Sequence, residues 1–382
     1  MTGGSLPRWA DVALIPAINL LAAAAISGLV VVIVGESPWV ALRALVWGAF
    51  GSWDQIGYTL FYTTSLVFTG LAVAIAFHCG LFNIGGEGQA MLGGLGVALV
   101  CLGLDGASWL ILFPLAVVGA ILFGGFFAFI PGYLQAARGS HTVITTIMFN
   151  FLAAILLNYL LVEVLIAPGE QSPQTIRFDE AGHLPFAHEL LAALGIESGR
   201  SPLNISFLLA LLAALLVWLF LWRSRWGYAL RCVGANEQAA RYGGISPGRN
   251  VMLAMTISGA LAGLMAVNEV MGAQHRLVLG FTAGFGFTGI AVALMGRNHP
   301  IGVVLAALLF GALYQGGSEL AFEVPTFTSD MVVVIQGLVI LFSGALENLF
   351  RGPIERWFQR RRLAAQNAEA GGAAPQGAEA SG

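Results

Sequence analysis

Long apolar stretches separated by short polar segments alternate along most of the chain. Crossing the hydrocarbon core of a bilayer takes about 20 apolar residues in a helix that rises about 1.5 Å per residue. The pattern therefore predicts an all-α, polytopic membrane protein with about ten transmembrane helices. These lie near residues 12–34, 57–77, 82–103, 109–134, 142–166, 203–222, 250–272, 283–296, 300–317 and 331–349. The stretches at 82–103 and 283–296 contain enough glycine to favour broken or re-entrant segments.

Composition supports a protein surrounded by lipid. Of the 382 residues, 58% are hydrophobic and only 10% are charged, whereas soluble domains carry about 25% charged residues. So little charge could not cover the surface of a water-soluble globule. The net charge of −3 gives no indication of a nucleic-acid partner.

The sequence contains no motif for catalysis or for a bound cofactor. All 17 basic residues are arginine, so a Walker phosphate-binding loop would lack its lysine. Gly284, Gly286 and Gly289 fit the GxGxxG dinucleotide fingerprint, but that motif requires a βαβ unit, which a membrane span cannot supply. No nucleophile elbow, HExxH motif or metal-ligand cluster is found. We therefore expect a protein that is not an enzyme and binds no cofactor itself, with any ATP hydrolysed by another subunit.

Arginine placement predicts the orientation, because basic residues near span ends are retained in the cytoplasm. Thirteen arginines fall in the segments that share a side with both termini, and four fall in the others. Both termini are therefore expected in the cytoplasm. The acidic loop at about 167–202 is then extracytoplasmic, with a short helix near 186–194 on the outer surface. Residues 1–362 are interpreted as one transmembrane domain, and residues 363–382, which lack an apolar face, as a disordered cytoplasmic tail.

The cytoplasmic loop at about 223–250 is too polar to span the membrane. Asn236 is a suitable helix N-cap, and Gly243 with Gly244 should end the helix that follows. This predicts a two-turn cytoplasmic helix between two spans. One interpretation is an ordinary basic interfacial loop, and the other is a docking helix for a cytoplasmic motor.

This loop resembles the coupling loop of bacterial ABC-transporter permeases of the branched-chain amino acid and simple-sugar class. The residues that carry the resemblance, and which it implies contact the ATPase, are Gly234, Ala235, Asn236, Ala239, Ala240 and Gly244. Two further stretches resemble the nucleoside and simple-sugar permeases within that class, of guanosine or ribose type. They are FHCGLFNIGGEGQAML at 77–92 and AGFGFTGIAVALMGRNHPIG at 283–302.

The two Gly-rich stretches suggest an internal pseudo-repeat with the substrate route between its halves. Polar groups inside spans are costly and should face the bundle, either lining a path or bonding neighbouring helices. The polar residues within the predicted spans are Asn150, Asn158, Asn268, Glu269 and Gln336. The candidate pathway residues are Asn83, Glu87, Gln89, Asn150, Asn268, Phe285 and Phe287.

The resemblance implies the permease subunit of an ATP-driven importer for nucleosides or simple sugars in the bacterial inner (plasma) membrane. It also implies a cytoplasmic ABC ATPase that holds ATP and Mg²⁺, an extracytoplasmic substrate-binding protein, and a second permease. The long N-terminal region and the FNIGGEGQ form suggest that the second permease is a distinct paralogue. The alternative is an ion-gradient-driven secondary transporter of small polar solutes, for which Glu87 and Glu269 are the plausible intramembrane carboxylates.

Overall fold

The computed structural model describes residues 7, 14–104, 106–193, 195, 199–324, 326–341, 352–356 and 359–360. The chain divides into two compact units, Trp39–Ser329 and a second unit formed by Met1–Pro38 with Asp330–Gly382. Among the described residues the structure is helical, and its β-pairing is limited to two isolated bridges, Gln174 with Val278 and Phe186 with Asn204. This confirms the all-α prediction for the described part of the chain.

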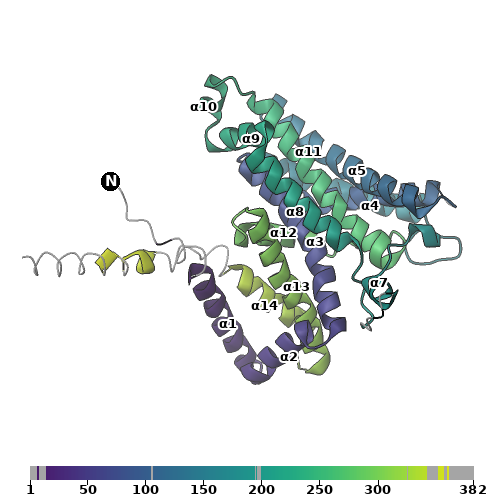
Figure 1. The fold of residues 1–382 in the computed structure, drawn as a ribbon, viewed down its shortest axis with the longest axis vertical. Coiled ribbons are helices and arrows are strands. Elements are labelled where there is room, and N and C mark those ends of the chain that lie inside the picture. The colour runs from purple at the N-terminus through teal and green to yellow at the C-terminus, as the bar shows by residue number, and fades with distance from the viewer. Residues whose placement is uncertain are drawn as a thin grey trace, which may run out of the picture. The chain divides into compact units, whose positions relative to one another are not determined.

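The larger unit, Trp39–Ser329, is a bundle of long helices (Figure 1). Two of its long helices continue into π-helical segments, α6 into η2 and α11 into η4. Its elements are α2 (Pro38–Phe50), α3 (Trp53–His78), α4 (Gly86–Gly103), α5 (Trp109–Arg138), α6 (Thr142–Tyr159), η2 (Leu160–Val164), η3 (Glu180–Gly182), α7 (Ala187–Ala193), α8 (Ser206–Arg223), α9 (Arg225–Ala235), α10 (Glu237–Tyr242), α11 (Pro247–Ala266), η4 (Val267–Gln274), α12 (Phe285–Met295) and α13 (Pro300–Glu323).

Seven helices of this unit are long and apolar enough to cross a membrane, and the described residues of the chain give eight if the bent pair α1 and α2 counts as one broken span. Each of the seven coincides with a predicted span. The expected ten are not reached within the described residues. The stretch at 283–296 forms only the 11-residue helix α12, which is about 16 Å long and too short to span the bilayer. The 13-residue helix α2 was not predicted.

The second unit contains α1 (Ile15–Ile33) and most of α14 (Ser329–Ile340). The stretch predicted at 12–34 is thus helical where it is described, with a proline in the first turn of α1, where its missing N–H costs nothing. The stretch predicted at 331–349 is helical as far as Ile340. The tail at 363–382 lies outside the described residues.

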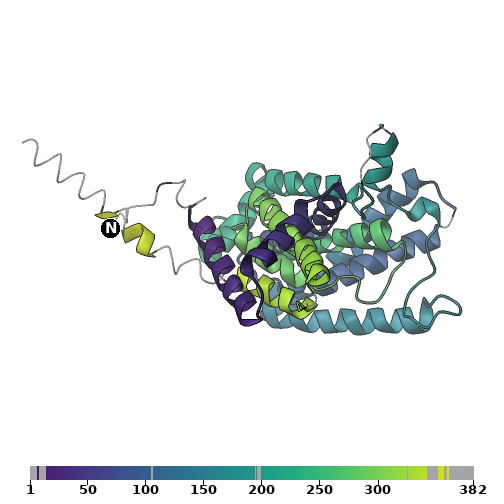
Figure 2. The ribbon, with the colours of Figure 1, turned by 90° about the horizontal axis from the view of Figure 1, so that it is seen from below.

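Helix α3 forms the core of the larger unit, and α6 lies at its edge. Of an apolar stretch of 18 residues, 83% is buried in α3 but only 17% in α6 with η2. Helix α6 runs along one side of the bundle (Figure 2). Helices α4, α5 and α11 approach one another through glycines. A Cβ on Gly263 would lie 2.4 Å from the carbonyl oxygen of Ala120, and one on Gly93 would lie 2.4 Å from the Cα of Gly263. Membrane helices pack closely in this way because they gain no hydrophobic driving force from lipid.

The two polar segments of the larger unit lie at opposite ends of α8 and α11 (Figure 1). At one end, α9 and α10 connect α8 to α11. At the other end, the loop between α6 and α8 contains α7 and pairs with the chain that follows η4, where Thr175 N–H donates to the carbonyl of Leu277. The short helix predicted near 186–194 is confirmed as α7.

Candidate functional site

The segment formed by α9 and α10 has the local structure that the sequence predicts. The Asn236 side chain accepts a hydrogen bond of 2.9 Å from the Ala239 N–H and caps α10. The helix ends at Gly243, and Gly244 follows with a φ of +81°, which favours glycine. Ser224 caps α9 in the same manner by accepting from the Gly227 N–H. The predicted two-turn helix is therefore confirmed.

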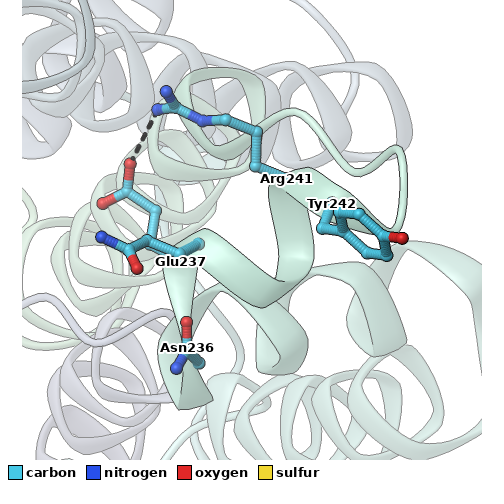
Figure 3. A pocket seen from close by; sticks show the side chains of 5 residues that line it. Asn236, Glu237, Arg241 and Tyr242 are labelled. Atoms are coloured by element: carbon cyan, nitrogen blue, oxygen red, sulfur yellow. Dashed lines mark hydrogen bonds and ion pairs between the residues drawn. The ribbon is translucent and has the colours of Figure 1, made fainter.

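Helix α10 presents polar and aromatic side chains to solvent (Figure 3). Asn236, Glu237, Arg241 and Tyr242 border a cleft of about 750 Å³. The Tyr242 side chain is 98% exposed, and Arg241 forms an ion pair of 3.1 Å with Glu237 one turn earlier. An exposed surface ion pair of this kind adds little stability.

A second cleft, of about 520 Å³, runs between α9 and α10. Tyr228, Cys232, Ala239 and Ile245 are among the residues that line it. Ala239 is exposed in this cleft, whereas Ala240 is only 5% exposed and packs within the loop. Both alanines line the cleft, but only Ala239 exposes its side chain there.

Gly234 joins this segment to the membrane helices. A Cβ on Gly234 would lie 2.2 Å from the His78 carbonyl oxygen, at the end of α3, so only glycine fits. Gly80, in the same turn, has a φ of +74° and also faces Gly234. The His78 ring in turn bonds the Asn298 carbonyl at 3.0 Å, between α12 and α13. The end of α9 therefore packs against the end of α3, which in turn is bonded to the connection between α12 and α13.

Residues 79–85 form the break between α3 and α4, and a buried polar network holds it in place. Asn83 donates to Gln89 at 2.9 Å and to the Ser258 hydroxyl of α11 at 2.8 Å. Its side-chain oxygen accepts from the Gly85 N–H and from Gln89. The Ser258 hydroxyl in turn donates a hydrogen bond to the Ala72 carbonyl in α3. Asn83 and Gln89 are therefore engaged in joining three helices.

Asn150, from α6, secures the first turn of α4. Its side-chain oxygen accepts from the Gly88 N–H and its amide donates to the Ile84 carbonyl, both at 2.9 Å. The expectation that polar residues inside spans face the bundle holds for Asn150, Asn268 and Glu269, which are buried. It is wrong for Asn158, which is exposed on the outer face of α6. Only part of the bundle buries α6, so a residue on its outer face does not meet another helix of the described unit.

The Glu87 carboxylate joins the two Gly-rich segments. It accepts hydrogen bonds from the Gly286 N–H at 2.8 Å, the Gly284 N–H at 3.1 Å and the Thr282 hydroxyl at 2.5 Å. It thereby caps the start of α12, where a negative charge is favoured. A Cβ on Gly286 would lie 2.2 Å from the Glu87 nitrogen. The segments expected to flank the substrate route are thus in direct contact in this conformation.

The π-helical segment η4 places two polar side chains against α3. Asn268 donates to the Ser65 hydroxyl at 2.9 Å and to the Phe61 carbonyl, while its oxygen accepts from Asn204 and Ser206. The adjacent Glu269 accepts from the same Ser65 hydroxyl at 2.8 Å. π-Helical turns are rare and occur often at functional sites. The sequence contains no signal for this one.

An aromatic cluster lies beside these polar groups, between α3, α12 and α13. The ring of Tyr314 stacks on Tyr62 with centroids 5.7 Å apart and meets the edge of Phe285 at 5.3 Å. The Thr288 hydroxyl lies 3.2 Å from the Tyr314 hydroxyl. Of the two predicted phenylalanines, Phe285 belongs to this cluster, whereas Phe287 is 48% exposed. Tyr62 and Tyr314 were not predicted, although a tyrosine hydroxyl inside an apolar span indicates a polar neighbour.

A pair of stacked histidines lies at the opposite end from α10. His275, directly after η4, has a φ of +54° and its ring lies 3.8 Å from that of His183. Burial, followed by the neighbouring His183 and Arg177, lowers the pKa of His275 to about 4, while its bond to the Met271 carbonyl and the nearby Glu189 oppose the shift. The neutral ring is the form that fits this packing.

We predict that this loop loosens in mild acid. The pKa of His275 is depressed below its ordinary value of 6.5, so the unfolded loop binds a proton that the folded loop excludes. The stabilisation from the neutral ring is complete above pH 6.5 and declines as the pH falls toward 4. Hydrogen exchange of residues 171–190, corrected for intrinsic rates, should be faster at pH 5 than at pH 7.

His275→Asn should remove this pH dependence, since asparagine tolerates the left-handed backbone but does not titrate. His141→Asn, at an exposed position in the connection between α5 and α6, is the matched control and should retain it. Equal protection of the wild-type loop at both pH values would contradict the prediction.

Comparison of this chain with known proteins shows its family. The family described as branched-chain amino acid transport system permease component matches residues 55–344. The chain belongs to this family. It is the permease subunit of an ABC transporter and not an enzyme, so it works within a system that includes an ATPase and a substrate-binding protein. The resemblance seen in the sequence is confirmed, whereas the comparisons give no support to the ion-gradient alternative.

Three relatives indicate the range of this family. The guanosine ABC transporter permease protein NupP of Bacillus subtilis is 38% identical over 86% of this chain and 92% of its own length. The glucose ABC transporter permease protein TsgB13 of Haloferax volcanii is 34% identical over 94% of this chain and 93% of its own length. A second guanosine permease of B. subtilis, NupQ, is 27% identical over 66% of this chain and 78% of its own length.

Proposed function

We propose that this permease carries nucleosides into the cell, driven by ATP that a separate ATPase subunit binds with Mg²⁺ and hydrolyses. The observation that carries the proposal is the exposed α9–α10 segment at one end of the bundle, in a chain that is 38% identical to a guanosine permease. Simple sugars are the second candidate substrate class, because a glucose permease is 34% identical.

We place the α9–α10 end of the bundle in the cytoplasm of a bacterium, with both termini on the same side. The connections at this end contain most of the arginines of the larger unit, as the positive-inside rule requires. They are Arg138, Arg223, Arg225, Arg231, Arg241, Arg249 and Arg297. The loop with α7 then faces outward, where a substrate-binding protein delivers its cargo.

In the proposed coupling step, ATP-driven closure of the ATPase displaces α10 and α9. Gly234 transmits this movement to the turn at His78–Gly80, because backbone is packed on backbone there. The Asn83 network then moves α4 with α3, and Glu87 moves α12 with α4. The helices rock as a group and open the pathway alternately to each side, which is a rigid-body mode of conformational change. No covalent chemistry on this chain is required.

The proposed second permease is a distinct paralogue rather than another copy of this chain. Bacillus subtilis has two guanosine permease proteins that are similar to this chain, at 38% and 27% identity. The difference between these identities supports assignment of this chain to the NupP-like position of a pair whose other position is NupQ-like.

Affinity purification of this chain from its native membrane in mild detergent, followed by mass spectrometry, tests the assembly. We expect a Walker-motif ATPase and a second, different multispan permease in amounts similar to that of the tagged chain. Recovery of the chain alone, even after cross-linking, would contradict the proposal. Recovery of the ATPase with only one kind of permease would contradict the paralogous pair alone.

A further inference from the structure

The two buried glutamates of the bundle differ in how they are satisfied. The two carboxylate oxygens of Glu87 accept three hydrogen bonds. Glu269 is 5% exposed, yet among the described residues it accepts a single hydrogen bond, from Ser65. A carboxylate inside a membrane bundle is costly when so few donors satisfy it, and such groups mark substrate pathways. Glu269 therefore has acceptor capacity left for a ligand.

Glu269 lies next to the aromatic cluster. Its hydrogen-bond partner Ser65 lies one turn after Tyr62 on α3, and residues three apart are neighbours on one face of a helix. Tyr62 and Tyr314 stack near the middle of α3 and α13, and both are half-buried, so their rings are partly accessible. Tyr58, one turn earlier on α3, is 37% exposed. The aromatic surface therefore extends along α3 toward the end that holds α7.

The tyrosine rings and the Glu269 carboxylate suit a nucleobase better than a sugar. Tyrosine rings stack on a nucleobase, since every base has a π-face, whereas a hexose has none. A carboxylate accepts the N–H donors of a base edge. A guanine-type base presents two adjacent donors, its ring N–H and its exocyclic amino group, which match the two oxygens of one carboxylate. A sugar could use the carboxylate but would gain less from the tyrosines.

We propose that Tyr62, Tyr314 and Glu269 form a nucleobase contact site within the membrane part of the permease. The base stacks on the tyrosines, and Glu269 accepts the N–H donors of a guanine-type edge. The inference rests on the proposed function, which requires that nucleosides cross this subunit, and it adds a preference among them. Glu87, Asn83 and Gln89 act in positioning the helices around the site.

Uptake of guanosine and inosine by the complete complex in proteoliposomes tests the site. Inosine lacks the exocyclic amino group, and both nucleosides are used at concentrations that saturate the binding protein, so that its affinity does not affect the ratio of rates. Glu269→Gln should lower the guanosine-to-inosine ratio about tenfold, the effect of one hydrogen bond to a charged group. Glu163→Gln, at an exposed position in η2, is the matched control and should leave the ratio unchanged.

The tyrosines are tested in the same assay. Tyr62→Ala should slow the uptake of both nucleosides about tenfold without changing their ratio, and Tyr62→Phe should restore the rates because the ring alone is needed. A well-folded Glu269→Gln complex with the wild-type ratio, or a Tyr62→Ala complex with wild-type rates, would overturn the site. A wild-type complex that takes up glucose but neither nucleoside would instead overturn the proposed function, and the site with it.

Photolabelling of the wild-type complex with 8-azidoguanosine tests the site without any variant. Label in peptides that contain residues 58–65 or 310–316 would support the contact site. Label confined to the binding protein or to other subunits would overturn it.

Discussion

Glu87→Ala is expected to destabilise the permease by about 4 kcal/mol, enough to prevent recovery of a well-folded protein. The carboxylate accepts three hydrogen bonds in a buried position, two of them from backbone N–H groups at the start of α12. Each hydrogen bond to a charged group contributes roughly 1.5 kcal/mol or more, and removing the acceptor leaves the buried donors unsatisfied. Thermal denaturation in detergent, together with the yield of monodisperse protein, measures the effect.

Two further variants separate the capping role from a general loss of charge. Glu87→Gln retains one acceptor oxygen and should show an intermediate loss. Thr282→Val removes a single donor and should cost about 1–2 kcal/mol. Glu163→Ala, at an exposed glutamate in η2, is the control and should be neutral. A Glu87→Ala permease with wild-type thermal stability would show that the carboxylate does not hold α12.

Ala239→Arg is expected to uncouple ATP hydrolysis from transport while the membrane helices stay folded. Ala239 is exposed and lines the cleft between α9 and α10, so a bulky charge there would obstruct a docked ATPase. Uptake by reconstituted complex should fall at least about tenfold, corresponding to roughly 1.4 kcal/mol of lost interaction, and loaded binding protein should no longer stimulate the ATPase. Ala240 is left unchanged because a charge at this buried position would disrupt the loop itself.

The control for this variant is Ala137→Arg. Ala137 is exposed at the end of α5, on the same arginine-rich face but outside both clefts. This control should couple normally, because it adds the same charge at the same end of the bundle without entering either cleft. Normal coupling in Ala239→Arg as well would show that the ATPase does not dock in this cleft.

Hydrophobic length and helix capping were sufficient to predict much of this fold. The seven long apolar helices of the larger unit each coincide with a predicted stretch. A helix that crosses the bilayer needs a continuous run of about 20 apolar residues, which is easily recognised in a sequence. Asn236 and Gly243 were sufficient to predict where α10 begins and ends, because helix capping depends only on neighbouring residues of the chain. The stretch at 283–296 was misjudged by length alone. Its 14 residues would reach only about 21 Å as a helix, and the short α12 that forms after Gly284 fits the accompanying expectation of a broken or re-entrant segment.

The candidate pathway could be predicted only in part, because burial and pairing are tertiary properties. The sequence shows that Asn83, Glu87, Gln89 and Asn150 are polar and lie in apolar surroundings, but not that their hydrogen bonds go to neighbouring helices. It does not show that η4 is π-helical and directs both Asn268 and Glu269 toward Ser65. Tyr62 and Tyr314 are 252 positions apart and come together only through the packing of α3 against α13.

ATP-dependent nucleoside uptake tests the central claim most directly. The permease is reconstituted into proteoliposomes with its co-purified ATPase and second permease, and radiolabelled guanosine is supplied with the binding protein on the opposite side from ATP. We expect guanosine to accumulate with ATP and Mg²⁺ present, and not when the ATPase carries a substitution in its Walker lysine. Uptake that needs no ATP, follows an imposed ion gradient and persists without the ATPase would contradict the account.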